Sequence, residues 1–160
     1  MSNREAAAPA ALQLCVASEG DFEPLLALRI AAMRESLERI DRFDPERARQ
    51  RFRASFAPEH TRHVLVHGRR VGFVAVTRSG EGLSLDHLYL HPDEQGRGIG
   101  SAVLALVFHE ADALGLELRV GALRGSASNG FYQRHGFVLE EEGQFDLYYV
   151  RRVGGAAPTL

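Results

Sequence analysis

Gln95-Gly96-Arg97-Gly98-Ile99-Gly100-Ser101 is the most informative stretch of this 160-residue chain. It lies between an apolar run that predicts a strand, Leu83–Leu90, and an amphipathic segment that predicts a helix up to Leu114. Glycine lets a ligand approach the backbone closely, and the first N–H groups of a helix have no partner within the helix. With the positive end of the helix dipole, these features predict a site for an anion, most often a phosphate.

The spacing of this stretch argues against two common phosphate loops. A Walker loop carries Lys and then Ser or Thr after its last glycine, whereas Gly100 is followed by Ser101 and Ala102. A dinucleotide-binding loop has the pattern G-x-G-x-x-G and an acidic residue at the end of the next strand. The glycines here alternate instead, and the next predicted strand ends in Val120-Gly121.

A third pattern, Q/R-x-x-G-x-G/A, fits the stretch through Gln95, Gly98 and Gly100. Two further segments accompany it, and they are Leu88-Tyr89-Leu90-His91-Pro92 and Asn129-Gly130-Phe131-Tyr132-Gln133-Arg134-His135-Gly136-Phe137. In order and separation the three segments resemble the GCN5-related N-acetyltransferase (GNAT) superfamily, over about Val64 to Val150. The resemblance implies an enzyme that takes an acetyl group from acetyl-CoA, or from another short acyl-CoA, and transfers it to an amine.

The resemblance also implies an α/β fold with a central mixed sheet flanked by helices. In the family, the strands equivalent to Leu83–Leu90 and Glu117–Gly121 splay apart at the loop end, and their backbone groups pair with the pantetheine arm. The order of elements expected from periodicity and turn residues matches this fold. Strands are expected at Leu12–Ala17, His63–His67, Arg70–Thr77, Leu83–Leu90, Glu117–Gly121, Phe137–Glu141 and Phe145–Val150. Helices are expected at Phe22–Arg39, from Asp44-Pro45-Glu46 to about Ser55, at Gly98–Leu114 and at Ser126–Arg134.

Composition indicates one ordinary domain, residues 12–153, between a disordered tail at 1–11 and a second tail at 154–160. The net charge of −2 gives no strong attraction to nucleic acid or to an anionic membrane, and no apolar run is long enough to span a bilayer. All 19 basic residues are Arg, which we interpret as a high-GC bacterial bias. The single cysteine, Cys15, excludes an internal disulfide and fits a reducing compartment, so we expect a cytoplasmic protein. Its place in a strand predicts a buried structural thiol.

The resemblance implies a set of donor-binding residues, with no metal among the groups required. The loop binds the pyrophosphate through backbone amides, Arg97 can meet a phosphate directly, and the strand contributes backbone groups. Asn129 either bonds the pantetheine or caps the short helix, although many relatives carry an Asn further upstream, where this chain has Gly125. The full set is Leu88, Leu90, Gln95, Gly96, Arg97, Gly98, Ile99, Gly100, Ser101, Asn129 and Tyr132.

Three residues are catalytic candidates. Tyr132 stands where the family often places the general acid, and a phenol with its ordinary pKa near 10 stays protonated at neutral pH. Packing of its helix on the sheet is the alternative for Tyr132. Asp86 lies near the position of a catalytic Glu in many relatives, and His87 has the better native pKa for a base. The structural alternative for Asp86 is a carboxylate held by neighbouring groups, and the alternative for His87 is a packed histidine.

The sequence does not identify the acceptor, which the resemblance implies is a primary amine of a small molecule or of a protein. The residues that could face it are Arg29, Met33, Arg34, Glu35, Tyr148 and Tyr149. The run Arg47, Arg49, Arg51 and Arg53 spreads around a helix and predicts a solvated surface. A non-catalytic acyl-CoA-binding module and a scaffold for another nucleotide are the competing hypotheses. Homodimers are common in the family.

Overall fold

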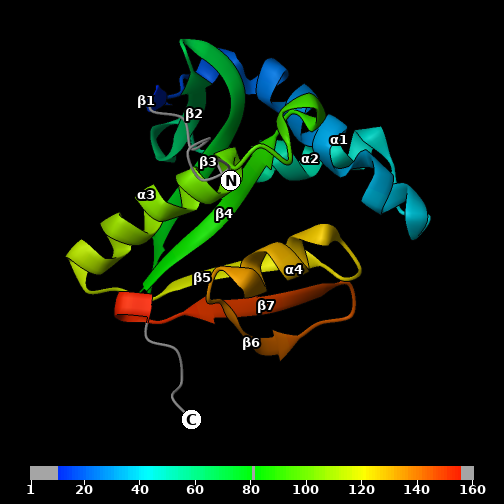
Figure 1. The fold of residues 1–160 in the computed structure, drawn as a ribbon. Coiled ribbons are helices and arrows are strands. Elements are labelled where there is room, and N and C mark those ends of the chain that lie inside the picture. The colour runs from blue at the N-terminus through cyan, green and yellow to red at the C-terminus, as the bar shows by residue number, and fades with distance from the viewer. Residues whose placement is uncertain (1–10, 81, 156–160) are drawn as a thin grey trace. The chain divides into compact units, whose positions relative to one another are not determined.

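The computed structural model describes residues 11–80 and 82–155. One seven-stranded sheet has the strand order β1-β2-β3-β4-β5-β7-β6 (Figure 1). The strands are β1 (Leu12–Val16), β2 (Thr61–Val66), β3 (Arg69–Ser79), β4 (Gly82–Leu90), β5 (Leu118–Leu123), β6 (Val138–Glu142) and β7 (Asp146–Arg151). The helices are α1 (Phe22–Arg39), α2 (Pro45–Ser55), α3 (Ile99–Leu114) and α4 (Ala127–Arg134). The predicted fold class and order of elements are confirmed.

The chain divides into two compact units, which are described separately. The first unit holds the chain up to Ala75 together with His87–Val103, and the second holds Val76–Asp86 and everything from Leu104 onward. Strands β3 and β4 and helix α3 each contribute a segment to both units.

Strands β1, β2 and β3 pair antiparallel in the first unit. The β2–β3 turn consists of His67 and Gly68, with φ of 53° and 77°. Two successive positive φ values fit the tight two-residue hairpins whose twist matches that of the strands. The strands expected at His63–His67 and Arg70–Thr77 leave Gly68-Arg69 as the turn between them, and the observed turn lies one residue earlier because His67 takes a left-handed conformation.

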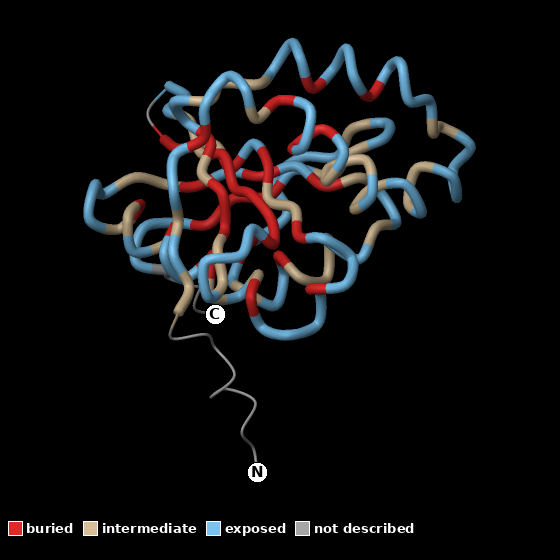
Figure 2. Tube along the Cα trace, turned by 90° about the horizontal axis from the view of Figure 1, so that it is seen from above, coloured by how far each residue is buried: buried red, intermediate tan, exposed pale blue. Residues whose placement is uncertain are grey.

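Aromatic rings form the core of the first unit. Phe22 at the start of α1 stacks on Phe52 of α2 with ring centroids 5.3 Å apart, and Phe52 lies 5.8 Å from Phe73 of β3. All three side chains are buried, and Figure 2 marks such buried positions in red. Asp44 caps α2 by accepting hydrogen bonds from the backbone N–H groups of Glu46 and Arg47. The sequence thus folds two helices whose apolar faces meet on aromatic residues.

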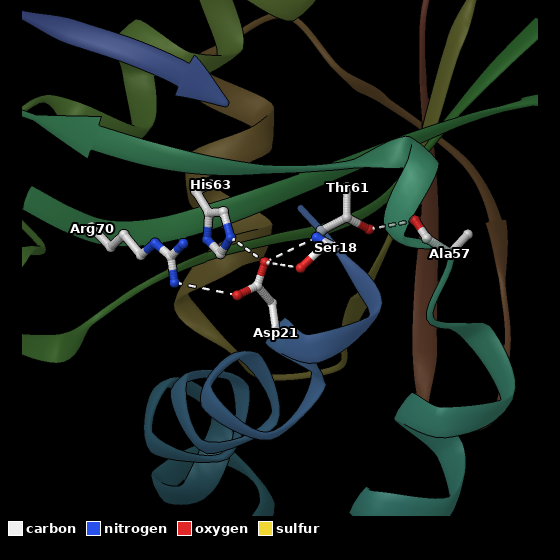
Figure 3. Close-up of polar contacts among 6 residues, drawn as sticks. All are labelled: Ser18, Asp21, Ala57, Thr61, His63 and Arg70. Atoms are coloured by element: carbon white, nitrogen blue, oxygen red, sulfur yellow. Dashed lines mark hydrogen bonds and ion pairs between the residues drawn. The ribbon is translucent and has the colours of Figure 1, made fainter. Parts of the chain in front are cut away.

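A buried polar contact joins the start of α1 to β2 (Figure 3). His63 is 2% exposed, and its Nε2 lies 2.9 Å from Oδ2 of Asp21. The same carboxylate accepts hydrogen bonds from the backbone N–H and the hydroxyl of Ser18, and Arg70 Nη1 lies 3.3 Å from its other oxygen. The hydrogen bonds with His63 and Ser18 lower the pKa of Asp21 to about 2, and the bond with His63 is the largest cause.

The second unit is built on β5, which pairs antiparallel with β7, while β7 pairs antiparallel with β6. Strands β4 and β5 pair in parallel, as the crossover rule predicts, from Leu83–Leu118 to Leu85–Val120. Strand β4 then continues to Leu90, five residues beyond its last pair in this register. Buried Arg151 of β7 forms a bidentate ion pair with Asp112 of α3, at 2.9 and 3.1 Å.

One burial prediction was wrong. Cys15 is exposed, because β1 is an edge strand whose partly buried residues are Leu12 and Leu14 on the alternate positions. On α3, Val103, Val107 and Ala111 are fully buried. Leu114 is 55% exposed, because it ends the helix directly before Gly115, whose φ is 70°.

The predicted tails fall almost entirely outside the described residues. Of the tail residues, the structure describes only Ala11 and Gly154-Gly155, and the latter belong to a short 3-10 turn. Within residues 11–80 and 82–155, no helix has the length and apolar character needed to cross a membrane. The same residues contain no group of three or more His, Cys, Asp or Glu side chains that could hold a metal ion.

The lowered pKa of Asp21 predicts a pH-dependent contribution to stability. A carboxyl with a depressed folded-state pKa stabilises the fold above its ordinary pKa near 3.8, and the contribution is lost as the pH falls toward 2. We therefore expect Asp21→Asn to lower the free energy of unfolding by about 2 kcal/mol at pH 6. The difference from the parent protein should shrink between pH 4 and pH 2, as measured by urea unfolding at several pH values.

Asp146→Asn is the matched control, since its carboxylate has no hydrogen bond or ion pair within the described part of the chain. A constant difference between Asp21→Asn and the parent at all pH values would contradict the assignment.

Candidate functional site

The end of β4 is held closely against β3 within the first unit. Gly72 of β3 faces it so closely that an added Cβ would lie 2.3 Å from the carbonyl oxygen of Tyr89 and 2.6 Å from Cδ2 of Leu90. The N–H of His91 donates to the carbonyl of Val71 at 2.9 Å. Only glycine permits this approach, so the backbone around Leu90 has one defined position.

A side chain of the loop that follows β4 forms a hydrogen bond with the end of that strand. A short 3-10 turn, Pro92–Glu94, leads to Gln95, whose Nε2 donates to the carbonyl of Leu90 at 3.1 Å. Gln95 was predicted as a ligand-binding position of the loop. The structure gives its side chain a bond within the loop, which holds the two ends of this connection together.

Gly96 and Gly98 give the loop its shape. Their φ values are 78° and 81°, a region that side chains rarely adopt, and an added Cβ would meet nothing within 4 Å at either position. Helix α3 begins directly afterwards at buried Ile99, and the first helical bond runs from the N–H of Ala102 to the carbonyl of Gly98 at 3.1 Å. Backbone donors at a helix start, with open space beside two glycines, fit an anionic group.

A charge network lies beside the loop. Glu94 pairs with Arg69 at 2.6 Å and with Arg97 at 3.8 Å, and the hydrogen bond from Arg69 is the main reason why its pKa is lowered. Two guanidinium groups therefore face one carboxylate at a site that we expect to take an anion. Arg97 was predicted for this site, while Glu94 and Arg69 were not, because no local pattern links residues 25 positions apart.

The two candidate bases lie on opposite faces of β4, as strand alternation predicts. Asp86 is exposed, and it accepts hydrogen bonds from the hydroxyls of Thr77 at 2.7 Å and Ser84 at 2.6 Å. Each oxygen of this carboxylate is engaged by one hydroxyl.

His87 lies among aromatic rings in the first unit. Its ring is 5.3 Å from that of Phe52 and 5.9 Å from that of Tyr89. Its Nε2 lies 3.3 Å from the hydroxyl of Ser55 at the end of α2. The catalytic roles of Asp86 and His87 stay predictions.

Asn129 and Tyr132 lie in the second unit, on α4. Asn129 donates to the carbonyls of Leu123 and Ser126 at 2.9 and 3.0 Å, and its Oδ1 accepts from the hydroxyl of Tyr149 at 2.7 Å. These contacts attach α4 to the end of β5 and to β7. The N-cap position of α4 is Ser126, so these bonds of Asn129 are not a helix cap, and its contact with a cofactor stays a prediction.

Tyr132 is buried against Phe137, with the two rings 5.3 Å apart in an edge-on arrangement. Phe131 lies on its other side at 5.4 Å. The backbone carbonyl of Tyr132 accepts from the N–H groups of His135 and Phe137, which ends the helix. The ring therefore has a fixed position, which a proton donor and a packing residue both require.

The predicted acceptor-facing residues divide into paired and unpaired side chains. Arg34 pairs with Glu38, and Glu35 pairs with Arg39, along the exposed side of α1. Arg29 is half-buried one turn before Met33 and has no ion pair among the described residues. In the second unit, Tyr148 is 41% exposed and Tyr149 is buried. The four arginines of α2 are all exposed, and two of them pair with acids: Arg49 with Glu23 and Arg53 with Glu19.

Comparison with known proteins places the chain in a family. No curated protein matches it in sequence. Among solved structures, PaiA N-acetyltransferase from Thermoplasma acidophilum in complex with coenzyme A is 18% identical, with a TM-score of 0.73 over 88% of this chain and 98% of that one. An acetyltransferase from Thermus thermophilus is 20% identical, with a TM-score of 0.67 over 89% and 97%.

N-acetylglutamate synthase from Neisseria gonorrhoeae, complexed with coenzyme A and N-acetylglutamate, is 18% identical with a TM-score of 0.66. The match covers 90% of this chain and 35% of the larger enzyme. At these identities the likeness concerns the fold. The family model described as "Acetyltransferase (GNAT) domain" matches residues 59–139, which is just over half of the chain and includes β4, the glycine loop and α4. The chain therefore belongs to the GNAT acetyltransferase family.

Proposed function

We propose that the protein transfers an acetyl group from acetyl-CoA to a primary amine by direct attack, with donor and acceptor bound at the same time. The observation that carries this proposal is the loop after β4. Gly96 and Gly98 have positive φ and open space beside their Cα atoms, and they stand directly before the first turn of α3. Backbone amides in this arrangement are suited to a pyrophosphate.

The donor site would use the remaining predicted residues of the first unit. The N–H groups of Ile99 and Gly100 lie at the positive end of the helix dipole, and Arg97 adds a charge beside them. Leu88 and Leu90 contribute backbone groups at the end of β4, where pairing with β5 has already ended at Leu85. Acetyl-CoA would supply the thioester, and its sulfur would depart as the thiolate of coenzyme A. Two structural neighbours, from Thermoplasma and Neisseria, are complexes with coenzyme A.

The protein's own groups would move two protons. Tyr132 is the proposed general acid, which protonates the departing sulfur through its phenol. His87 is the proposed base that takes a proton from the attacking amine, because an imidazole exchanges protons near neutral pH. Asp86 is the less favoured base, since both of its oxygens already accept hydroxyl hydrogen bonds.

Release of free thiol from acetyl-CoA in the presence of a broad panel of amines tests the proposal directly. We expect at least one amine to accelerate thiol release well above hydrolysis, and acetyl-CoA to raise the melting temperature. Gly98→Val should abolish that thermal shift, because a branched side chain is strained at a φ of 81° and fills the space beside the loop.

Two results would contradict the proposal in different ways. A thermal shift with acetyl-CoA but no turnover of any amine would indicate a non-catalytic acyl-CoA-binding module. A shift with another nucleotide and none with acetyl-CoA would indicate a different phosphate ligand.

Tyr132→Phe should lower kcat by about 100-fold, because the variant keeps the ring but loses the proton donor. The KM for acetyl-CoA should stay within about 2-fold, since the contacts of the ring with Phe131 and Phe137 are preserved. Steady-state kinetics at saturating amine measures both quantities. An unchanged kcat in Tyr132→Phe would leave this residue with a packing role alone.

The pH dependence of kcat/KM distinguishes between His87 and Asp86 as the base. With His87 as the base, kcat/KM should show an acidic limb, because protonation of the imidazole removes the base. His87→Gln should lower activity by about 100-fold and remove that acidic limb. Asp86→Asn should keep the limb and most of the activity. The reverse pattern would assign the base to Asp86.

A further inference from the structure

Arg29 stands out among the arginines of the first unit by its surroundings. Its guanidinium carbon lies 5.9 Å from the ring centroid of Phe52 and 5.7 Å from that of Tyr89. Its Nε is buried and has no hydrogen-bond partner among the described residues. The Nε side of this cation is thus removed from water, and the guanidinium packs on aromatic rings, while the residue as a whole remains partly exposed.

The acidic residues of α1 and of the short turn before it do not neutralise Arg29, because other side chains engage them. At the start of α1, Glu19 pairs with Arg53 and Glu23 with Arg49, while Asp21 bonds His63 and Arg70. Further along α1, Glu38 pairs with Arg34 and Glu35 with Arg39. The part of the chain that the structure describes therefore gives Arg29 no counter-ion.

A guanidinium in this position favours an external anion. Arg stays charged at any physiological pH, so it cannot relieve the cost of burial by losing a proton. Aromatic packing leaves the outer N–H groups at the edge of the guanidinium plane, where they match the two oxygens of a carboxylate. An anion of the right size gains two charge-assisted hydrogen bonds without disturbing any existing ion pair.

The position of Arg29 connects it with the reacting groups. Tyr89, which it contacts, lies between Leu88 and Leu90 on β4, and the ring of Tyr89 is 5.9 Å from that of His87. The proposed base and Arg29 thus share one face of the strand. If His87 deprotonates the amine of an acceptor, groups of the acceptor next to that amine would lie on the same face of β4 as Arg29.

We propose that Arg29 binds a carboxylate of the acceptor, and that the acceptor is an amino acid or a similar molecule with its amine and carboxylate close together. This inference rests on the proposed acetyl transfer. A phosphate of the cofactor is the other source of an anion. The glycine loop already provides backbone donors for phosphate, whereas Arg29 contacts the aromatic residues on the His87 face of β4.

The test pairs each amino acid with its carboxamide, for example glycine with glycinamide, as acceptors in the thiol-release assay. We expect the parent protein to prefer carboxylates by about 10- to 100-fold in kcat/KM. Arg29→Gln should remove that preference and leave the KM for acetyl-CoA unchanged, while Arg29→Lys should keep only part of it, since an ammonium lacks the planar fork. Arg47→Gln is the matched control, an exposed arginine of α2 that should behave as the parent.

Binding measured without turnover separates this inference from the proposed function. Calorimetric titration of the same amino acids and amides, in the presence of coenzyme A, reports carboxylate recognition directly. Arg29-dependent binding of amino acids without turnover would keep the inference and overturn the catalytic proposal. Turnover with equal use of acids and amides, the absence of Arg29-dependent binding, or an Arg29→Gln variant with a raised KM for acetyl-CoA would overturn the inference.

Discussion

In the proposed function, the backbone at the end of β4 must be held in place by its neighbours and still be available to a ligand. Two contacts in the structure meet the first requirement. Gly72 admits the carbonyl of Tyr89 to a distance at which any Cβ would overlap it, and Gln95 returns to the carbonyl of Leu90. The strand end is therefore fixed by β3 and by its own loop. The glycines of that loop then carry no side chain toward the space in which we propose the pyrophosphate.

Sequence patterns predicted the fold well because most of its signals are local. The bounds of α1 agree to the residue, and Asp44-Pro45 marks the start of α2, because a carboxylate that accepts from helical N–H groups followed by a proline is a local device. The errors concern properties that depend on distant partners. Cys15 has the alternation of a strand, but its exposure follows from the edge position of β1, which only the sheet order reveals.

The candidate site was predictable only in part, for the same reason. The glycine loop is contiguous and was found from its spacing. The contacts that distinguish its neighbours join residues far apart in sequence: Glu94 with Arg69, Ser55 with His87, and Asn129 with Tyr149. Arg29 was named as an acceptor-facing residue among several others on α1. What distinguishes Arg29 from Arg34 is visible only in the structure: Arg34 pairs with Glu38, whereas Arg29 lies on aromatic rings with no ion pair among the described residues.

The composition of these ion pairs has a chemical consequence for an enzyme that acetylates amines. Every basic residue of the chain apart from histidine is Arg, so the surface pairs of α1 and α2 are made by guanidinium groups. A guanidinium stays protonated and is a poor nucleophile, whereas a lysine side chain would offer an amine to a nearby thioester. The protein therefore presents no side-chain amine that competes with its acceptor, and its network of charges is chemically inert toward the acyl donor that it is proposed to use.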